Sequence, residues 1–146
     1  MQATTTRPKT GMPKDLRQFF ETYRDAFNSL QGDAVAELYA EPSGIAQGGV
    51  YAHWPSRAPV AENMNALCDL YRKKGYAKAD FEPVACINQG DQYAVADLRW
   101  RIEWNDGQEP WQFNTTYNMV RTPQGWRVLL CTAYTEDTLF KATSAA

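Results

Sequence analysis

Three consecutive stretches near the C-terminal end of the sequence alternate apolar and polar residues with a period of two. They are Tyr93–Trp104, Trp111–Arg121 and Trp126–Tyr134. Alternation of this kind, in segments rich in aromatic and β-branched residues, is typical of strands with one buried face. The turn sequences Asn105-Asp106-Gly107 and Thr122-Pro123-Gln124-Gly125 separate the stretches. The sequence therefore predicts an antiparallel meander of three strands, and the rest of the chain must cover its apolar face.

Pairing the strands across both turns predicts one aromatic core face. We set Trp104 opposite Trp111 in the first hairpin and Arg121 opposite Trp126 in the second, because a slip of one residue would turn every side chain over. The residues then expected on the core face are Ala96, Leu98, Trp100, Ile102, Trp104, Trp111, Phe113, Thr115, Tyr117, Met119, Val128, Leu130, Thr132 and Tyr134. The outer face is half polar, but it also holds Val95, Val120, Leu129 and Cys131. Since bare apolar patches are unusual on a monomer, we expect a homodimer through this outer face.

Helical patterns precede the meander. An apolar stripe predicts a helix that begins near Asp15, with Asp15 and Gln18 spaced as a capping box. The other predicted elements are a short helix at Asp33–Tyr39, a hairpin at Ser43–Trp54 turning at Gly48-Gly49, a helix from about Pro59 to Lys74 that stops at Gly75, and an edge strand at Ala79–Asn88 that contains Pro83. This order predicts an α+β fold with helices on one face of a curved sheet.

Composition limits the classes of function. The 146 residues fit one domain, and we expect a flexible arm at residues 1–14, the domain at 15–136 and a tail at 137–146. A formal charge of −2 without a basic stripe gives no support for nucleic-acid binding. No secretory signal or membrane span is recognisable, so we expect a cytoplasmic protein. Cys68, Cys86 and Cys131, with a single histidine, lack the spacing of a disulfide framework or zinc site, so we expect free thiols and neither metal nor cofactor.

The ordered set of short motifs resembles a known superfamily. The motifs are Phe-Phe-x-x-Tyr, Phe-Asn-x-x-x-Gly-Asp and Leu-Tyr-Ala, followed by a long helix after a glycine hairpin and by the terminal Gly125-Trp126-Arg127-Val128. Together they resemble the nuclear transport factor 2-like superfamily, including its SnoaL-like and ketosteroid-isomerase-like branches, over about Asp15 to Glu136. The resemblance implies a cone, in which a strongly curved antiparallel sheet wraps around three helices and encloses a central pocket. It also implies that homodimers are common.

The resemblance assigns roles to three positions. Ketosteroid isomerases use a carboxylate base and two donors that hold a developing oxyanion. Tyr23 matches the helix tyrosine of that site, and Tyr117 stands where the second donor would be. The position of the base falls on Gln47 or Ala46, neither of which accepts a proton. Isomerisation of the ketosteroid type is therefore not expected.

The expected pocket combines rings with hydroxyl groups. Besides Tyr23 and Tyr117, the residues expected to contact a ligand are Gln47, Trp100, Trp104, Phe113, Thr115, Thr132 and Tyr134. Such a lining suits a small apolar ligand that carries an oxygen or two, and this is the first hypothesis. The second is an isomerase or dehydratase in which His53 is the base and Tyr23 and Tyr117 are the donors. The third is a dimerisation module in which the rings simply fill the core.

The charged residues of the first meander strand suggest one further comparison. Epoxide hydrolases of the superfamily place an arginine and aspartates on strands to activate water. Here the alternation directs Asp97, Arg99, Arg101 and Glu103 away from the tryptophans. Turning them inward would expose Trp100, Ile102 and Trp104 at about 25 cal/mol per Å² of apolar surface. We therefore expect an outward ladder of cross-strand pairs.

Overall fold

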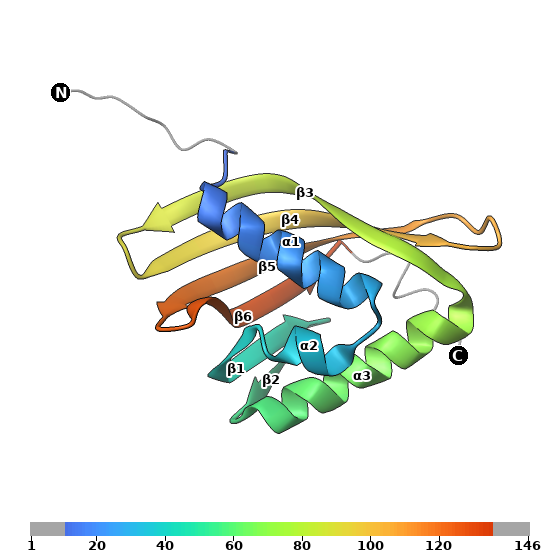
Figure 1. Ribbon diagram of the computed structural model, residues 1–146, viewed down its shortest axis with the longest axis horizontal. Helices are drawn as coiled ribbons and strands as arrows, with labels where there is room; N and C mark the ends of the chain where they lie inside the picture. The colour runs from blue at the N-terminus through green and yellow to red at the C-terminus, as the bar shows by residue number, and fades with distance from the viewer. Residues whose placement is uncertain (1–10, 136–146) are drawn as a thin grey trace.

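The computed structural model describes residues 11–135, so most of the expected arm and the whole expected tail lie outside the described residues. Within that range the chain forms three helices and six strands (Figure 1). In order they are α1 (Lys14–Asn28), α2 (Gly32–Ala36), β1 (Tyr39–Gln47), β2 (Val50–Trp54), α3 (Arg57–Lys74), β3 (Tyr76–Gln89), β4 (Tyr93–Trp104), β5 (Trp111–Thr122) and β6 (Gly125–Tyr134). No helix within residues 11–135 has both the length and the apolar character needed to cross a membrane.

The strands form one mixed sheet with the order β2-β1-β6-β5-β4-β3. β1 runs parallel to β6, whereas every other neighbouring pair is antiparallel. Figure 1 shows the helices on one face of a long, twisted sheet that does not curl around them. The predicted α+β class is confirmed, but the wholly antiparallel, strongly curved sheet is wrong. Turn sequences reveal only pairings between neighbours in the chain, and the β1–β6 pairing is not of that kind.

The apolar stripe of α1 packs against the sheet, as its spacing predicts, and Leu16 and Phe20 are fully buried. The predicted capping box is wrong, because α1 begins after Pro13 and no side chain caps it. The carboxylate of Asp15 instead accepts hydrogen bonds from Arg121 Nη1 at 3.1 Å and from Trp126 Nε1 at 3.2 Å. Asp15 thus joins the first turn of α1 to the β5–β6 hairpin.

The first hairpin of the meander pairs two residues away from the predicted register. Trp100 lies opposite Phe113, and Ile102 lies opposite Trp111. Two residues are one full period of a strand, so each side chain keeps its face. Trp100 is accordingly 3% exposed, and the predicted core face of β4 is confirmed.

A bulge in the second hairpin changes the core face of β6. Met119 pairs with Val128 as predicted, but Asn118 pairs with Leu130, so Leu129 has no opposite residue. Beyond this point Cys131 lies opposite Tyr117 on the core face, and it is 3% exposed. One inserted residue reverses the alternation of a strand. The prediction that Leu130, Thr132 and Tyr134 face the core, with Cys131 outside, is therefore wrong.

The outer face of the sheet carries the expected polar ladder. Arg99 Nη1 donates to Asn114 Oδ1 at 2.8 Å, and Arg101 Nε lies 3.2 Å from a carboxylate oxygen of Glu103. The hydroxyl of Tyr134 donates to Asp97 Oδ2 at 2.6 Å. These charged residues therefore belong to the outer face and not to a cavity that activates water.

Candidate ligand-binding site

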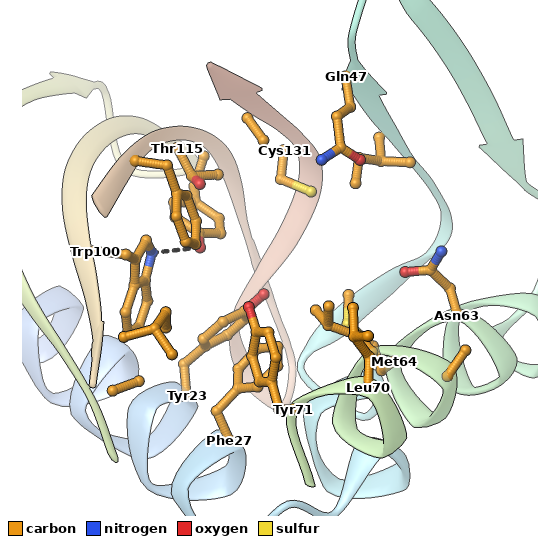
Figure 2. A pocket seen from close by; sticks show the side chains of 18 of the residues that line it. Tyr23, Phe27, Gln47, Asn63, Met64, Leu70, Tyr71, Trp100, Thr115 and Cys131 are labelled. Atoms are coloured by element: carbon orange, nitrogen blue, oxygen red, sulfur yellow. Dashed lines mark hydrogen bonds between the residues drawn. The ribbon is translucent and has the colours of Figure 1, made fainter. Parts of the chain in front are cut away.

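A cavity of about 320 Å³ lies between the core face of the sheet and helices α1 and α3. Its wall is mainly apolar and aromatic, with polar groups at a few points (Figure 2). It is lined by Tyr23, Phe27, Tyr39, Ile45, Gln47, Asn63, Met64, Ala66, Leu67, Leu70, Tyr71, Ala79, Trp100, Ile102, Phe113, Thr115, Tyr117, Cys131 and Ala133. The volume and the mixture of rings with a few polar groups are those of a site for a small molecule.

Three phenol groups meet in the interior of this cavity. The Tyr23 and Tyr39 hydroxyls are 2.7 Å apart, and the Tyr39 hydroxyl lies 3.4 Å from Cys131 Sγ. Trp100 Nε1 donates to the Tyr117 hydroxyl at 2.9 Å, the bond drawn in Figure 2. The hydroxyls of Tyr23 and Tyr117 also interact, and their rings meet edge to face with centroids 5.5 Å apart. We call Tyr23, Tyr39, Trp100, Tyr117 and Cys131 the phenol cluster.

Burial keeps every member of the phenol cluster neutral. Desolvation raises the pKa of Tyr23 and Tyr39 well above the ordinary phenol value, and the neighbouring Cys131 and tyrosine groups add to the rise. Desolvation also raises the pKa of Tyr117. Removal of the Cys131 thiol from water raises its pKa to about 11. At physiological pH these side chains therefore offer neutral hydroxyl, thiol and indole groups and no anion.

Among residues 11–135, the lining of the cavity contains no Asp, Glu, Lys, Arg or His residue. Gln47 and Asn63 are the carboxamides of the wall, and neither exchanges a proton with a substrate. Within residues 11–135 no three His, Cys, Asp or Glu side chains gather in a group that could hold a metal ion. The chemistry available at the wall is hydrogen bonding between neutral groups.

Six of the ten residues proposed from the sequence line the cavity. They are Tyr23, Gln47, Trp100, Phe113, Thr115 and Tyr117. The remaining four do not line it. Thr132 and Tyr134 lie on the outer face beyond the β6 bulge, where they pair with Thr116 and Asn114. Trp104 packs in a separate aromatic group with Trp111, at 4.9 Å between ring centroids, and the Lys74 ammonium lies 5.1 Å from both rings.

His53 lies on the exposed side of the β1–β2 hairpin. Its Nδ1 is 3.1 Å from the Tyr51 hydroxyl, and both residues are exposed. Since His53 is absent from the cavity wall, the expected convergence of this imidazole with Tyr23 and Tyr117 on one space does not occur. His53 therefore lies outside the wall of the cavity that Tyr23 and Tyr117 line.

The sequence reading missed Tyr39, Cys131 and Asn63. Tyr39 was expected to end a helix, but it begins β1, and this turns its ring into the core. Cys131 was placed on the wrong face because the bulge was not anticipated. Asn63 could have been found from helical spacing, since it lies three and four residues before Ala66 and Leu67 on the cavity side of α3.

Comparisons with known proteins agree with this fold. The family model described as NTF2-like protein (DUF6841) matches residues 14–136. The crystal structure of an NTF-2 like protein of unknown function from Shewanella oneidensis MR-1 is similar with a TM-score of 0.67 and 16% identity, over 82% of this chain and 95% of that one. An NTF2-like protein with a cystatin-like fold from Novosphingobium aromaticivorans gives 0.68 and 19%, over 82% and 79%.

A third similar structure is a ketosteroid isomerase-like protein from Erwinia carotovora atroseptica SCRI1043. Its TM-score is 0.61 at 13% identity, over 82% of this chain and 92% of that one. At such identities these structures are evidence for the fold alone. No curated protein matches this chain.

Proposed function

The chain belongs to the NTF2-like protein family DUF6841, and from this premise we propose that its cavity binds a small, neutral, ring-bearing ligand that carries an oxygen atom. The single observation that supports the proposal is the composition of the wall. Neutral hydrogen-bonding groups converge in an otherwise apolar cavity, and none of the described residues that line it is charged. A ligand oxygen is the natural partner of such groups, because a buried polar group left unpaired is costly.

The shape of the wall favours a ligand with rings. Phe27, Trp100 and Phe113 present flat apolar surfaces to the cavity. Aromatic rings gain from edge-to-face or offset contacts in addition to the burial of their area. A ligand with a permanent charge is disfavoured, since the lining residues that the structure describes include no side chain of opposite charge.

A binding function without acid–base catalysis explains the residues of the cavity wall better than an enzymatic function does. An isomerase needs a group that takes a proton from the substrate within hydrogen-bond reach. Gln47 cannot do so, and the phenol cluster has pKa values raised by burial. The open volume of the cavity also argues against a core filled entirely by rings. We therefore propose a binding protein or an enzyme that has lost its base.

Titration with 2-naphthol, a ring-bearing phenol, tests the proposal directly. Calorimetry should give saturable binding to the wild type. Tyr117→Phe should weaken it by about two- to tenfold, since a neutral hydrogen bond contributes about 0.5–1.5 kcal/mol. Tyr93→Phe, the same chemical change at a ring exposed to solvent, is the matched control and should leave the affinity unchanged. Absence of saturable binding, or equal affinities for wild type and Tyr117→Phe, would contradict the proposed function.

A further inference from the structure

One face of helix α3 forms part of the cavity wall and also reaches solvent. Asn63, Ala66, Leu67 and Leu70 follow the spacing of a single helix face, and all four line the cavity. Asn63, Ala66 and Leu70 are at the same time exposed, and Leu70 is 39% exposed. A residue that lines a cavity and is exposed lies at its opening. This face of α3 therefore borders the mouth.

Asn63 is the polar member of that face. Its neighbours Ala66, Leu67 and Leu70 are apolar, and asparagine is a poorer helix former than leucine or alanine. Among the residues that the structure describes, the Asn63 side chain has no hydrogen-bond partner. Asn63 is exposed, where a polar side chain is common, and its place in the cavity wall also makes its carboxamide available to a ligand at the mouth.

A second carboxamide lies on the same side of the cavity. Gln47 ends β1, is exposed, and pairs with Ala133 of β6, which also lines the cavity. In Figure 2 the Gln47 side chain, from β1, and the Asn63 side chain, from α3, are both drawn on the side away from Trp100 and its hydrogen bond. A carboxamide both donates and accepts hydrogen bonds, so two of them can hold a hydroxyl, a carbonyl or an amide group.

We propose that Gln47 and Asn63 form a second polar subsite at the mouth, which selects elongated neutral ligands with a hydrogen-bonding group at each end. One ligand oxygen meets the phenol cluster, the rings fill the apolar middle, and the other polar group lies between the two carboxamides. The subsite serves the same ligand as the interior of the cavity, so it rests on the proposed function. Carboxylates and amines are not selected, because no charged side chain of the part of the chain that the structure describes lines the cavity.

Two probes of equal size test the subsite. They are 6-ethyl-2-naphthol and 6-hydroxymethyl-2-naphthol. At the end away from the phenol, the first probe ends in a methyl group and the second in a hydroxyl group. In the wild type the hydroxymethyl probe should bind about fivefold more tightly, the gain of one hydrogen bond. Asn63→Leu and Gln47→Leu should each remove this preference. Glu62→Leu, at an exposed position of the same helix outside the lining, should retain it.

The two proposals fail in different ways. Equal affinities of the two probes in the wild type, or a preference that survives in both Asn63→Leu and Gln47→Leu, would overturn the second subsite while the proposed function stands. Tyr117→Phe should weaken both probes alike and leave their ratio unchanged. If neither probe binds the wild type, both proposals are overturned together.

Discussion

The hydroxyl groups of Tyr23 and Tyr39 lie 2.7 Å apart, although the residues belong to different elements, helix α1 and strand β1. Both side chains are almost completely buried. Each hydroxyl therefore meets the hydrogen-bonding need of the other away from bulk water. This contact joins the helix layer to the sheet at the place where the cavity wall is formed.

Tyr39→Phe should lower the free energy of unfolding by about 1–3 kcal/mol, because it leaves the buried hydroxyl of Tyr23 and the thiol of Cys131 without this partner. Urea denaturation followed by tryptophan fluorescence measures the change. Tyr93→Phe, at an exposed ring, should change the stability by much less. Equal effects of the two substitutions would show that the Tyr23–Tyr39 contact contributes nothing to folding.

Stability should fall in alkaline solution because burial raises the pKa values of the phenol cluster. The folded state holds these protons more tightly than the unfolded state does, so the stabilisation is complete below the ordinary pKa values and is lost above them. Cys131 has a pKa of about 11 against an ordinary 9.0, and the tyrosines start from 10.0. The free energy of unfolding attributable to these groups should be constant up to about pH 9 and decline above it.

Urea denaturation across the alkaline range checks this, with Cys131→Ala as the control. In that variant the Cys131 thiol no longer contributes, so the decline above pH 9 should be shallower, while Cys68 and Cys86, whose pKa values are also raised by burial, still contribute. Identical pH profiles for the variant and the wild type would remove Cys131 from the explanation. A decline that begins near neutral pH would point to other groups altogether.

Gly32→Ala should be strongly destabilising. A Cβ atom at Gly32 would lie 2.5 Å from the backbone nitrogen of Asn65 and 2.7 Å from its Cα, so helices α2 and α3 would have to separate. Overpacking of this kind costs about 1–3 kcal/mol, and more where backbone must move. Gly11→Ala, where a Cβ would meet nothing within 4 Å, is the matched control. Thermal unfolding should show a lower midpoint for Gly32→Ala alone.

We expect the protein to form a homodimer through the outer face of the sheet. Ile87, at 54% exposure, lies opposite Val95, and Tyr93, at 47%, lies opposite Val120, so apolar surface is grouped near one end of that face. Sedimentation at micromolar concentration should give the mass of two chains, and Ile87→Asp should shift it to one. Val50→Asp, at an exposed residue of β2, should leave the dimer intact. A monomeric wild type would end this interpretation.

Periodicity predicted the helices, the strands of the meander and the core face of β4. Burial of one side places apolar residues at every second position of a strand and at every third or fourth position of a helix. Periodicity could not reveal the bulge at Leu129, since residues 128–131 (Val-Leu-Leu-Cys) are all apolar and fit either phase of the alternation. Thr132 and Tyr134 were misplaced for this reason. The parallel pairing of β1 with β6 was missed because the two strands are far apart in the sequence and no turn connects them directly.

The limits of periodicity and of boundary assignment also explain which residues of the candidate site could be predicted from the sequence. Tyr23 and Tyr117 were identified through resemblance to a superfamily, and both line the cavity. Tyr39 was expected to face inward from the end of a helix, but it was not identified as a site residue, because the boundary between α2 and β1 was misplaced and boundaries are the least certain part of a sequence-based assignment. His53 was proposed from its place at the end of a hairpin and from the resemblance to the dehydratases of the superfamily, and neither determines the direction of a side chain.

The parallel pairing of β1 with β6 has a consequence for synthesis on the ribosome. Tyr39 meets Cys131 across 92 positions of the chain, and β6 is the last strand within residues 11–135 to be translated. In a nascent chain that ends before β6, one edge of β1 has no neighbouring strand. The Cys131 thiol is then also missing from the cavity wall. Strands β1 and β6 can pair only after β6 has emerged, so this contact of high sequence separation forms late in synthesis. A chain truncated before β6 would lack the part of the cavity wall that Cys131 and Ala133 form.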